Sequence, residues 1–171
     1  EGAQLHAGVS TIPAAMAVAE RMVGVSGKEF LTAVTLGIDI VCRMGLANPE
    51  GPAGFILTAV YGFFGAAITA GKLLALNEEQ MVNALGIAYA QASGNNQCVV
   101  DGVLTKRMQA GFAAKGGIVA ALMAQKGITG ARNSLEGRMG LYHVYHGGRY
   151  DRAALTRDLG KRFEGSNLSL K

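Results

Sequence analysis

The sequence lacks tryptophan altogether, has two cysteines and three prolines, and has only 16% charged residues. So little charge beside 50% apolar residues excludes a disordered chain. Cys42 and Cys98 show neither CxxC nor metal-ligand spacing. We therefore expect free thiols in a reducing compartment, and no signal-peptide pattern is visible, so we expect a cytoplasmic protein.

Positive charge forms no stripe along the chain, although the formal net charge is +4 and the sequence pI is about 9.2. Basic and acidic residues alternate, as in "GGRYDRAALTRDLGKRFEG". Nucleic-acid-binding modules instead gather their basic residues on one face. We therefore expect solvated faces rather than a nucleic-acid partner.

Most motifs of enzyme chemistry are also missing. The chain has no GxSxG, P-loop or dinucleotide-binding fingerprint. His143 and His146 have the i,i+3 spacing of two metal ligands, but no carboxylate or cysteine completes a set. We expect both to be surface residues, and we expect neither a metal nor a cofactor.

The apolar residues that are present recur at helical spacing, and no alternating strand pattern appears before the last few residues. We expect Ser10 or Thr11 to cap the first helix, and Asn77 to cap the fourth with Gln80 in its first turn. This pattern predicts an all-α protein with helices over 10–23, 28–46, 55–76, 78–92 and 106–127, shorter helical pieces over 134–145 and 151–159, and an extended tail.

Glycine is abundant, with 25 residues, and much of it lies inside apolar runs. Small residues recur four apart in three of the expected helices, at positions 62/66/70, 84/88/92 and 116/120/124. Such stripes let helix axes approach closely. They predict a multi-helix core, because close packing must recover the cost of glycine within helices.

The uncharged stretch 55–71 is at the lower limit of length for crossing a bilayer. The neighbouring expected helices contain Glu20, Asp39 and Lys115, which are unfavourable in lipid. We therefore expect packing within a soluble core and no membrane partner.

The stretch "TKRMQAGFAAKGG", residues 105–117, places Lys106 and Arg107 at a helix N-terminus, which already carries partial positive charge. Either both side chains point into water, or they bind an anion there. His6 before the first helix, "GFILTA" before the third and the polar "SGNNQ" loop before Lys106 mark three such ends. If they converge, they form a pocket for a small polycarboxylate, with Lys106 as the anion clamp.

Four segments in this order resemble the helical domain of the 2-methylcitrate dehydratase (MmgE/PrpD) family. They are "HAGVSTIPAAMAVAE", "SGKEFLTAVTLGIDIVCRMGLA", "GFILTAVYGFFGAAITAGKLLALNEEQMVNALGIAYAQASG" and "TKRMQAGFAAKGGIVAALMAQKGITG". The resemblance implies a large all-α domain followed by a smaller α+β domain, a homodimer, and metal-independent chemistry. We expect an internal piece of such a protein, with 1–148 in the helical domain and 149–171 leading into the second.

Motif by motif, the resemblance assigns His6 to the family's loop histidine and Lys106 to its active-site lysine. Two family histidines are replaced here, by Ile56 after Gly54-Phe55 and by Gln109 in the Lys-x-x-His pattern. We therefore expect catalysis by His6 and Lys106. Residues expected to line the substrate pocket are Thr58, Asn95, Asn96, Gln97 and Gln109.

These assignments predict a lyase that acts on small di- or tricarboxylic acids by removing a proton alpha to a carboxylate, with elimination. The same scaffold fits an isomerase or epimerase. A non-catalytic helical binding or assembly module is a third reading, and the two missing histidines favour it.

Overall fold

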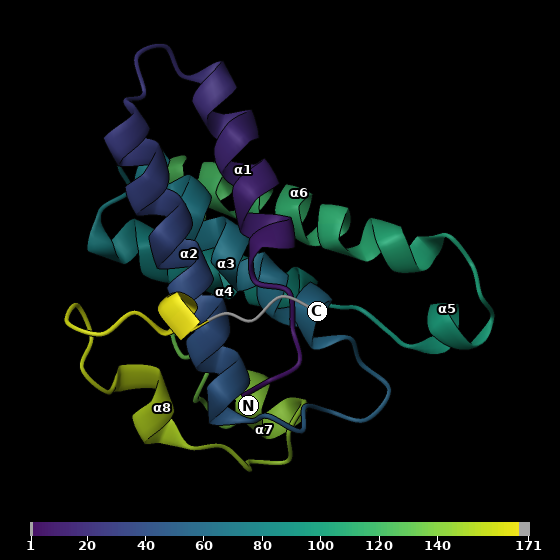
Figure 1. Ribbon diagram of the computed structural model, residues 1–171. Coiled ribbons are helices and arrows are strands. Elements are labelled where there is room, and N and C mark those ends of the chain that lie inside the picture. The colour runs from purple at the N-terminus through teal and green to yellow at the C-terminus, as the bar shows by residue number, and fades with distance from the viewer. Residues whose placement is uncertain (1, 168–171) are drawn as a thin grey trace.

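The computed structural model describes residues 2–167, and its regular elements are helices (Figure 1). Within this part of the chain no strand forms, and the expected all-α class is confirmed. The elements are α1 (Gly8–Arg21), α2 (Gly27–Ala47), α3 (Leu57–Leu73), α4 (Glu78–Gln91), α5 (Gln97–Val100), α6 (Thr105–Gln125), α7 (Leu141–Val144), α8 (Arg152–Thr156) and the 3-10 helix η1 (Glu164–Asn167).

Helix α3 forms the centre of the bundle, and α1, α2, α4 and α6 pack around it (Figure 1). Buried residues make up 14 of its 17 positions, as expected for a helix that is apolar on all sides. Neighbouring helices come close because small residues line the contacts. A Cβ atom on Gly117 of α6 would lie 2.5 Å from the Ala66 Cβ and 2.6 Å from the Ala67 nitrogen. All three expected stripes of small residues are buried.

Two of the long helices begin with a capping box, which pairs backbone N–H groups that the helix itself leaves free. At α4 the Gln80 N–H donates to Asn77 Oδ1 at 2.9 Å, and the Asn77 N–H donates to Gln80 Oε1 at 3.0 Å. Ser26 and Glu29 form the same arrangement at α2. The cap predicted at Asn77 is confirmed.

The cap predicted for the first helix is wrong. Helix α1 begins at Gly8, so Ser10 and Thr11 lie inside it and are buried. The Ser10 hydroxyl donates to the Ala110 carbonyl of α6 at 3.1 Å, and the Thr11 hydroxyl donates to the Ala7 carbonyl at 3.0 Å. These hydroxyls join α1 to a helix 100 residues away and to its own first turn, rather than capping it.

Other boundaries shift for local reasons. The third helix begins at Leu57 instead of 55, because Phe55 pairs with Asn95 in an isolated antiparallel bridge. It ends at Leu73, before Ala75 takes a left-handed conformation with φ of 53°. The loop predicted before Lys106 contains the short helix α5, and most of the piece expected over 134–145 consists of turns before α7.

A buried ion pair on α2 holds the C-terminal segment. Arg43 has no exposed surface, and its Nε donates to Asp39 Oδ2 at 2.7 Å. Its Nη1 and Nη2 donate to the carbonyls of Arg157 and Arg162 at 2.8 and 2.6 Å, and the Glu164 N–H donates to Asp39 Oδ1 at 2.7 Å. Every charged group is thus hydrogen-bonded, as burial requires.

Of the expected extended tail, residues 164–167 form η1 instead, and residues 168–171 lie outside the described part of the chain. The domain boundary expected near residue 148 stays a prediction. Of the described helices, α2 alone is long and apolar enough to cross a bilayer by length and composition, and half of the tested stretch is buried inside this structure. The 17-residue α3 is shorter than that test requires.

Candidate active site

Two loops meet in front of α3 and form the framework of the candidate site. The Ile56 N–H donates to the Gly94 carbonyl at 3.3 Å, and the Asn96 N–H donates to the Gly54 carbonyl at 2.9 Å. Gly54 has a φ of 79°, which favours glycine. A Cβ atom at Gly94 would lie 2.5 Å from the Ala59 Cβ. The polar "SGNNQ" loop is therefore fixed against the start of α3.

Gln109 of α6 also holds this loop, through two hydrogen bonds to the Asn95 backbone. Its Oε1 accepts from the Asn95 N–H and its Nε2 donates to the Asn95 carbonyl, both at 3.0 Å. The same Nε2 lies 2.9 Å from Cys98 Sγ, and the Gln109 side chain is buried. The amide is thus engaged within the protein, and the expected contact between Gln109 and substrate stays a prediction.

His6 is anchored at the start of α3 through its backbone. Its N–H donates to the Thr58 hydroxyl at 3.0 Å, which brings the segment before α1 to the first turn of α3. The His6 side chain is exposed, and Thr58 is half-buried. The segment before α1 and the start of α3, two of the three helix ends that the sequence analysis identified, therefore meet.

Lys106 and Arg107 lie in the first turn of α6, as the sequence predicts, and both are exposed. This N-terminus has no side-chain cap, and its first turn contains no acidic residue. Neither cation forms an ion pair with an acidic residue between residues 2 and 167. The helix end is consequently cationic through both its side chains and its backbone dipole, and such an end attracts anions.

The remaining polar residues divide between the loop and α5. Asn96 Nδ2 donates to the Phe55 carbonyl at 3.2 Å, so this side chain strengthens the contact between the loops. Gln97 Nε2 instead donates to Asp101 Oδ1 at 2.7 Å, within the turn that forms α5. Figure 1 shows α5 and the first half of α6 extending away from the helix bundle.

Hydrogen bonds thus connect the His6 backbone, Thr58, the two loops and Gln109 into one framework. Lys106 lies three residues before Gln109, so the two residues are neighbours on the surface of α6. At the two positions where the family usually has histidine, this chain has the half-buried Ile56 and Gln109, whose side chain is hydrogen-bonded to Asn95. The described chain therefore offers one imidazole here, that of His6, and a cationic helix end.

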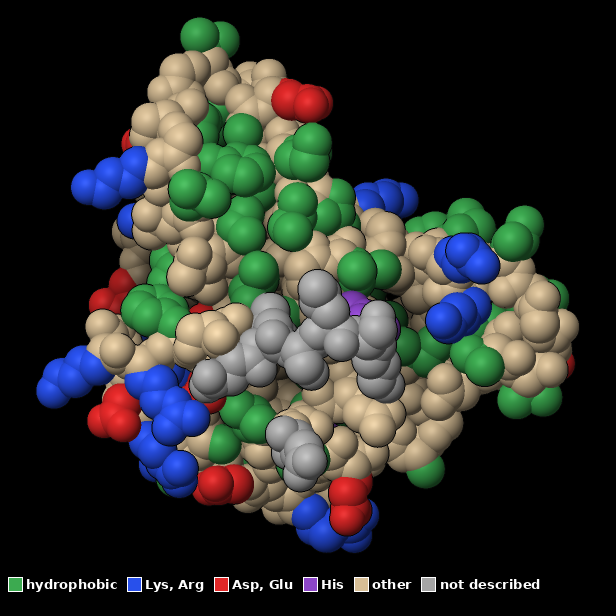
Figure 2. Space-filling view, viewed as in Figure 1, with side chains coloured by type: hydrophobic (Ala, Val, Ile, Leu, Met, Phe, Trp, Pro, Cys, Tyr) green, Lys and Arg blue, Asp and Glu red, His purple; other side chains and the backbone are tan. Residues whose placement is uncertain are grey.

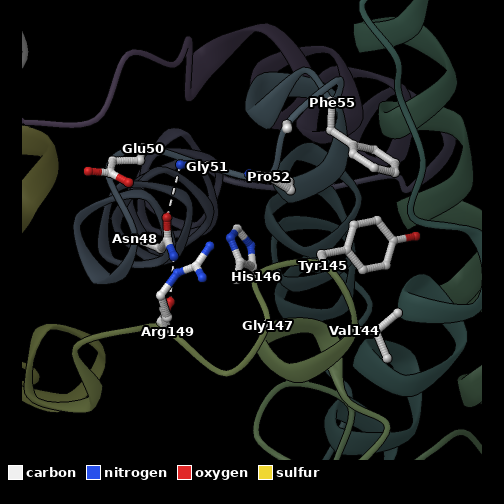
Figure 3. A pocket seen from close by; sticks show the side chains of 11 residues that line it. Asn48, Glu50, Gly51, Pro52, Phe55, Val144, Tyr145, His146, Gly147 and Arg149 are labelled. Atoms are coloured by element: carbon white, nitrogen blue, oxygen red, sulfur yellow. Dashed lines mark hydrogen bonds between the residues drawn. The ribbon is translucent and has the colours of Figure 1, made fainter.

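The prediction that His143 and His146 are both surface residues is wrong for His146. His143 is exposed, whereas His146 is 3% exposed and lines a cavity that sequence reasoning missed (Figure 3). Its Nε2 lies 3.0 Å from the hydroxyl of the fully buried Tyr61. The available signal was the spacing of Tyr142, Tyr145 and His146, which puts three rings on one side of a helical turn.

Within residues 2–167, no group of three or more His, Cys, Asp or Glu side chains is arranged so that it could hold a metal ion. The metal-free chemistry implied by the resemblance stays a prediction. Cys42 and Cys98 are both buried free thiols. Burial raises the pKa of Cys42 to about 11, with the charges of Asp39 and Glu164 adding to the shift, so this thiol stays protonated at neutral pH.

Known proteins are similar in sequence to this chain. A cis-aconitate decarboxylase-like protein of Aspergillus oryzae is 32% identical over 184 residues, covering 99% of this chain and 38% of that protein. The cis-aconitate decarboxylases of Aspergillus terreus and Homo sapiens are 35% and 31% identical, over 78% and 82% of this chain and 29% and 30% of their own lengths.

The chain thus spans between 29% and 38% of the length of these relatives, whose names describe lyases. The model of the MmgE/PrpD N-terminal domain matches residues 1–153, which include α1 to α7 and with them the whole candidate site. The chain belongs to the MmgE/PrpD family.

Proposed function

We propose that this chain is the helical part of a metal-independent lyase that acts on small di- or tricarboxylic acids. The observation that carries the proposal is the hydrogen-bonded framework joining the starts of α1 and α3, the 94–97 loop and α6. The names of the relatives, cis-aconitate decarboxylases, support a tricarboxylate substrate and a carbon–carbon lyase reaction.

Lys106 is proposed to bind a substrate carboxylate. It lies at an uncapped helix N-terminus, where the dipole and the ammonium group attract the same anion. His6 is proposed to transfer the proton. In an elimination, a base takes a proton alpha to a carboxylate as the leaving group departs from the neighbouring carbon. In a decarboxylation, the C–CO₂ bond breaks and the electron pair left on carbon accepts a proton.

The proposal extends to a homodimer in the cytoplasm that needs no cofactor. Large apolar side chains are exposed on the part of the chain that extends from the bundle, with Val100 77% and Leu104 76% exposed. Apolar surface of this kind is typical of protein–protein contact. The two free thiols support a reducing compartment.

The test compares two neighbouring cations in the complete protein. Replacing Lys106 by Met removes a charge-assisted contact worth about 1.5–3 kcal/mol, or roughly tenfold to a hundredfold in binding or rate. Arg107 points about 100° away on the helix, so Arg107→Met is the matched control and should change activity little. Neither substitution should lower the melting temperature, because each removes a cation from a helix N-terminus.

The substrate screen uses citrate, 2-methylcitrate, cis-aconitate and aspartate-like acids, first by thermal shift and then by product analysis. Equal activity losses from Lys106→Met and Arg107→Met, or no loss from either, would contradict the anion clamp.

A non-catalytic binding module is the alternative that a specific observation favours. The two family histidine positions hold Ile56 and Gln109, and the Gln109 amide is bound to Asn95. A protein stabilised by a carboxylate without turning it over would support this alternative. Interconversion of isomers without loss of water or carbon dioxide would instead indicate an isomerase or epimerase.

A further inference from the structure

The cavity lined by His146 lies between the loop that follows α2 and the end of α7 (Figure 3). Its volume is about 540 Å³, within the range of small-molecule sites. Residues 48–55 form one side of the cavity and residues 144–149 form the other. None of the candidate active-site residues lines it, so its function can be tested independently of the proposed lyase activity.

The protonation of His146 follows from its surroundings. Burial raises the pKa of Tyr61, so its hydroxyl keeps its proton and can donate. Burial, and to a lesser extent the charge of Arg149, lowers the pKa of His146, so this imidazole is neutral at pH 7. With the Tyr61 hydroxyl as the donor to Nε2, 3.0 Å away, the imidazole proton resides on Nδ1.

This leaves a buried donor without a partner. His146 Nδ1 is shielded from solvent and has no hydrogen-bond acceptor in the described part of the chain. Nearly all buried polar groups in proteins are paired, so an unpaired one beside a cavity indicates a missing acceptor. Figure 3 shows the His146 ring in the middle of the cavity lining, between Arg149 and Tyr145.

Arg149 supplies positive charge beside this donor. Its guanidinium extends towards His146 in Figure 3, and it has no acidic partner within residues 2–167. Asn48 fixes the backbone here, donating through Nδ2 to the Arg149 carbonyl and accepting from the Gly51 N–H at 2.9 Å. The carboxylate of Glu50, at the rim, is directed away from His146 (Figure 3).

The other side of the cavity is apolar. The rings of Phe55 and Tyr145 are 5.0 Å apart between centroids, and Val144 lies beside them in the lining. The Tyr145 hydroxyl is already used, because it donates to the Ala92 carbonyl at 2.7 Å. This wall therefore presents aromatic and aliphatic surface to a ligand.

We propose that this cavity binds a small monocarboxylate that carries an apolar group. The carboxylate pairs with the Arg149 guanidinium and accepts a hydrogen bond from His146 Nδ1–H. The apolar group packs on Phe55, Val144 and Tyr145. A neutral ligand leaves the arginine unpaired, and a purely polar anion leaves the aromatic wall uncovered, so the donors and the wall together select this class.

The probe is benzoate, titrated into the complete protein by calorimetry and by NMR of the His146 ring. We expect saturable binding with a dissociation constant between about 0.1 and 10 mM, and a shift of the His146 Nδ1–H signal. Arg149→Gln should weaken binding at least about tenfold, because it removes the charge that pairs with the carboxylate. Arg149 is exposed, so this variant should keep its fold.

The matched control is Arg132→Gln, which removes the same charge from an exposed position outside the cavity lining and should leave binding within about twofold. Lys106→Met should bind benzoate unchanged, which separates this site from the candidate active site. His146→Phe, which keeps an aromatic ring, should also weaken binding.

The proposal would be overturned by no saturation at about 20 mM benzoate, by equal weakening in Arg149→Gln and Arg132→Gln, or by binding of neutral benzamide as tight as that of benzoate. Tighter binding of inorganic phosphate than of benzoate would also overturn it, because the apolar wall would then contribute nothing.

Discussion

The two halves of α6 have opposite environments. From Ala113 to Ala124 the helix packs into the bundle through glycine and alanine, and Gly117 has no room for a side chain against Ala66 and Ala67. From Thr105 to Phe112 the helix extends away from the bundle and, with α5, forms what we call the arm, residues 95–112 (Figure 1). In the arm Met108 is 51% exposed and Phe112 is 47% exposed.

The space-filling view shows the surface of the arm. Lysine and arginine side chains project on the arm beside apolar ones (Figure 2). The buried half of α6 carries no candidate site residue, yet it fixes the direction of the helix and thereby the place of Lys106. A rigid, buried element can thus hold an exposed functional group without taking part in the chemistry.

Adding a methyl group to each half of α6 should have the largest effect on stability. Gly117→Ala should lower the free energy of unfolding by about 3 kcal/mol, because the new Cβ would overlap the α3 backbone. Gly111→Ala is the matched control, since nothing lies within 4 Å of a Cβ there. It should raise stability by about 0.5–1 kcal/mol through helix propensity. Denaturant unfolding measures both, and a neutral Gly117→Ala would contradict the close packing.

The next test concerns the contact within the arm between Gln109 of α6 and Asn95 of the preceding loop. Gln109→Met should lower the free energy of unfolding by about 2 kcal/mol, because the Asn95 N–H and carbonyl lose their partners. Gln97→Met alters the same loop, but its side chain is exposed, and stability should change by less than about 0.5 kcal/mol. Equal effects on the denaturation midpoint would show that the loop is not held by α6.

In the bundle, burial of His146 should make stability depend on pH. The pKa of His146 is lower in the folded protein than the ordinary 6.5, so between the two values the unfolded chain binds the extra proton. Stability is therefore lost as pH falls below about 6.5, by at most about 1.4 kcal/mol per pH unit. Unfolding between pH 7 and 5 measures this slope, above the range where carboxylates such as Glu136 titrate.

His146→Gln should flatten this slope. His143→Gln, three residues earlier and exposed, should leave it unchanged. A slope that survives in His146→Gln would assign the pH dependence to another group.

The smallest expected change in stability comes from substitutions at the starts of α4, in the bundle, and α6, in the arm. Asn77→Ala should cost about 1 kcal/mol, because it removes the capping box of α4. Leu104 precedes α6 without a side-chain cap and is 76% exposed, so Leu104→Ala should change stability by less than about 0.5 kcal/mol. The difference between the two melting temperatures provides the measurement, and a larger loss from Leu104→Ala would reverse the comparison.

Most of the bundle could be predicted from sequence because its signals are local. Helical spacing of apolar residues identified the five long helices within a few residues, and Asn77 with Gln80 fixed the start of α4. The cap predicted from local sequence at α1 was wrong, because the Ser10 hydroxyl instead donates to the carbonyl of Ala110, 100 residues away. The candidate active site was predicted only as a set of helix ends. The mutual position of Asn95 and Gln109 required the folded chain.

The sequence alone determined the helical class, the stripes of small residues and the placement of cations at the start of α6, because each depends on neighbours within one or two helical turns. Tertiary structure decided that His146 lies buried against Tyr61, 85 residues away, and that Phe55 pairs with Asn95 instead of starting α3. The burial of a side chain and its partners depend on which distant elements pack beside it, and a local sequence pattern does not determine those elements.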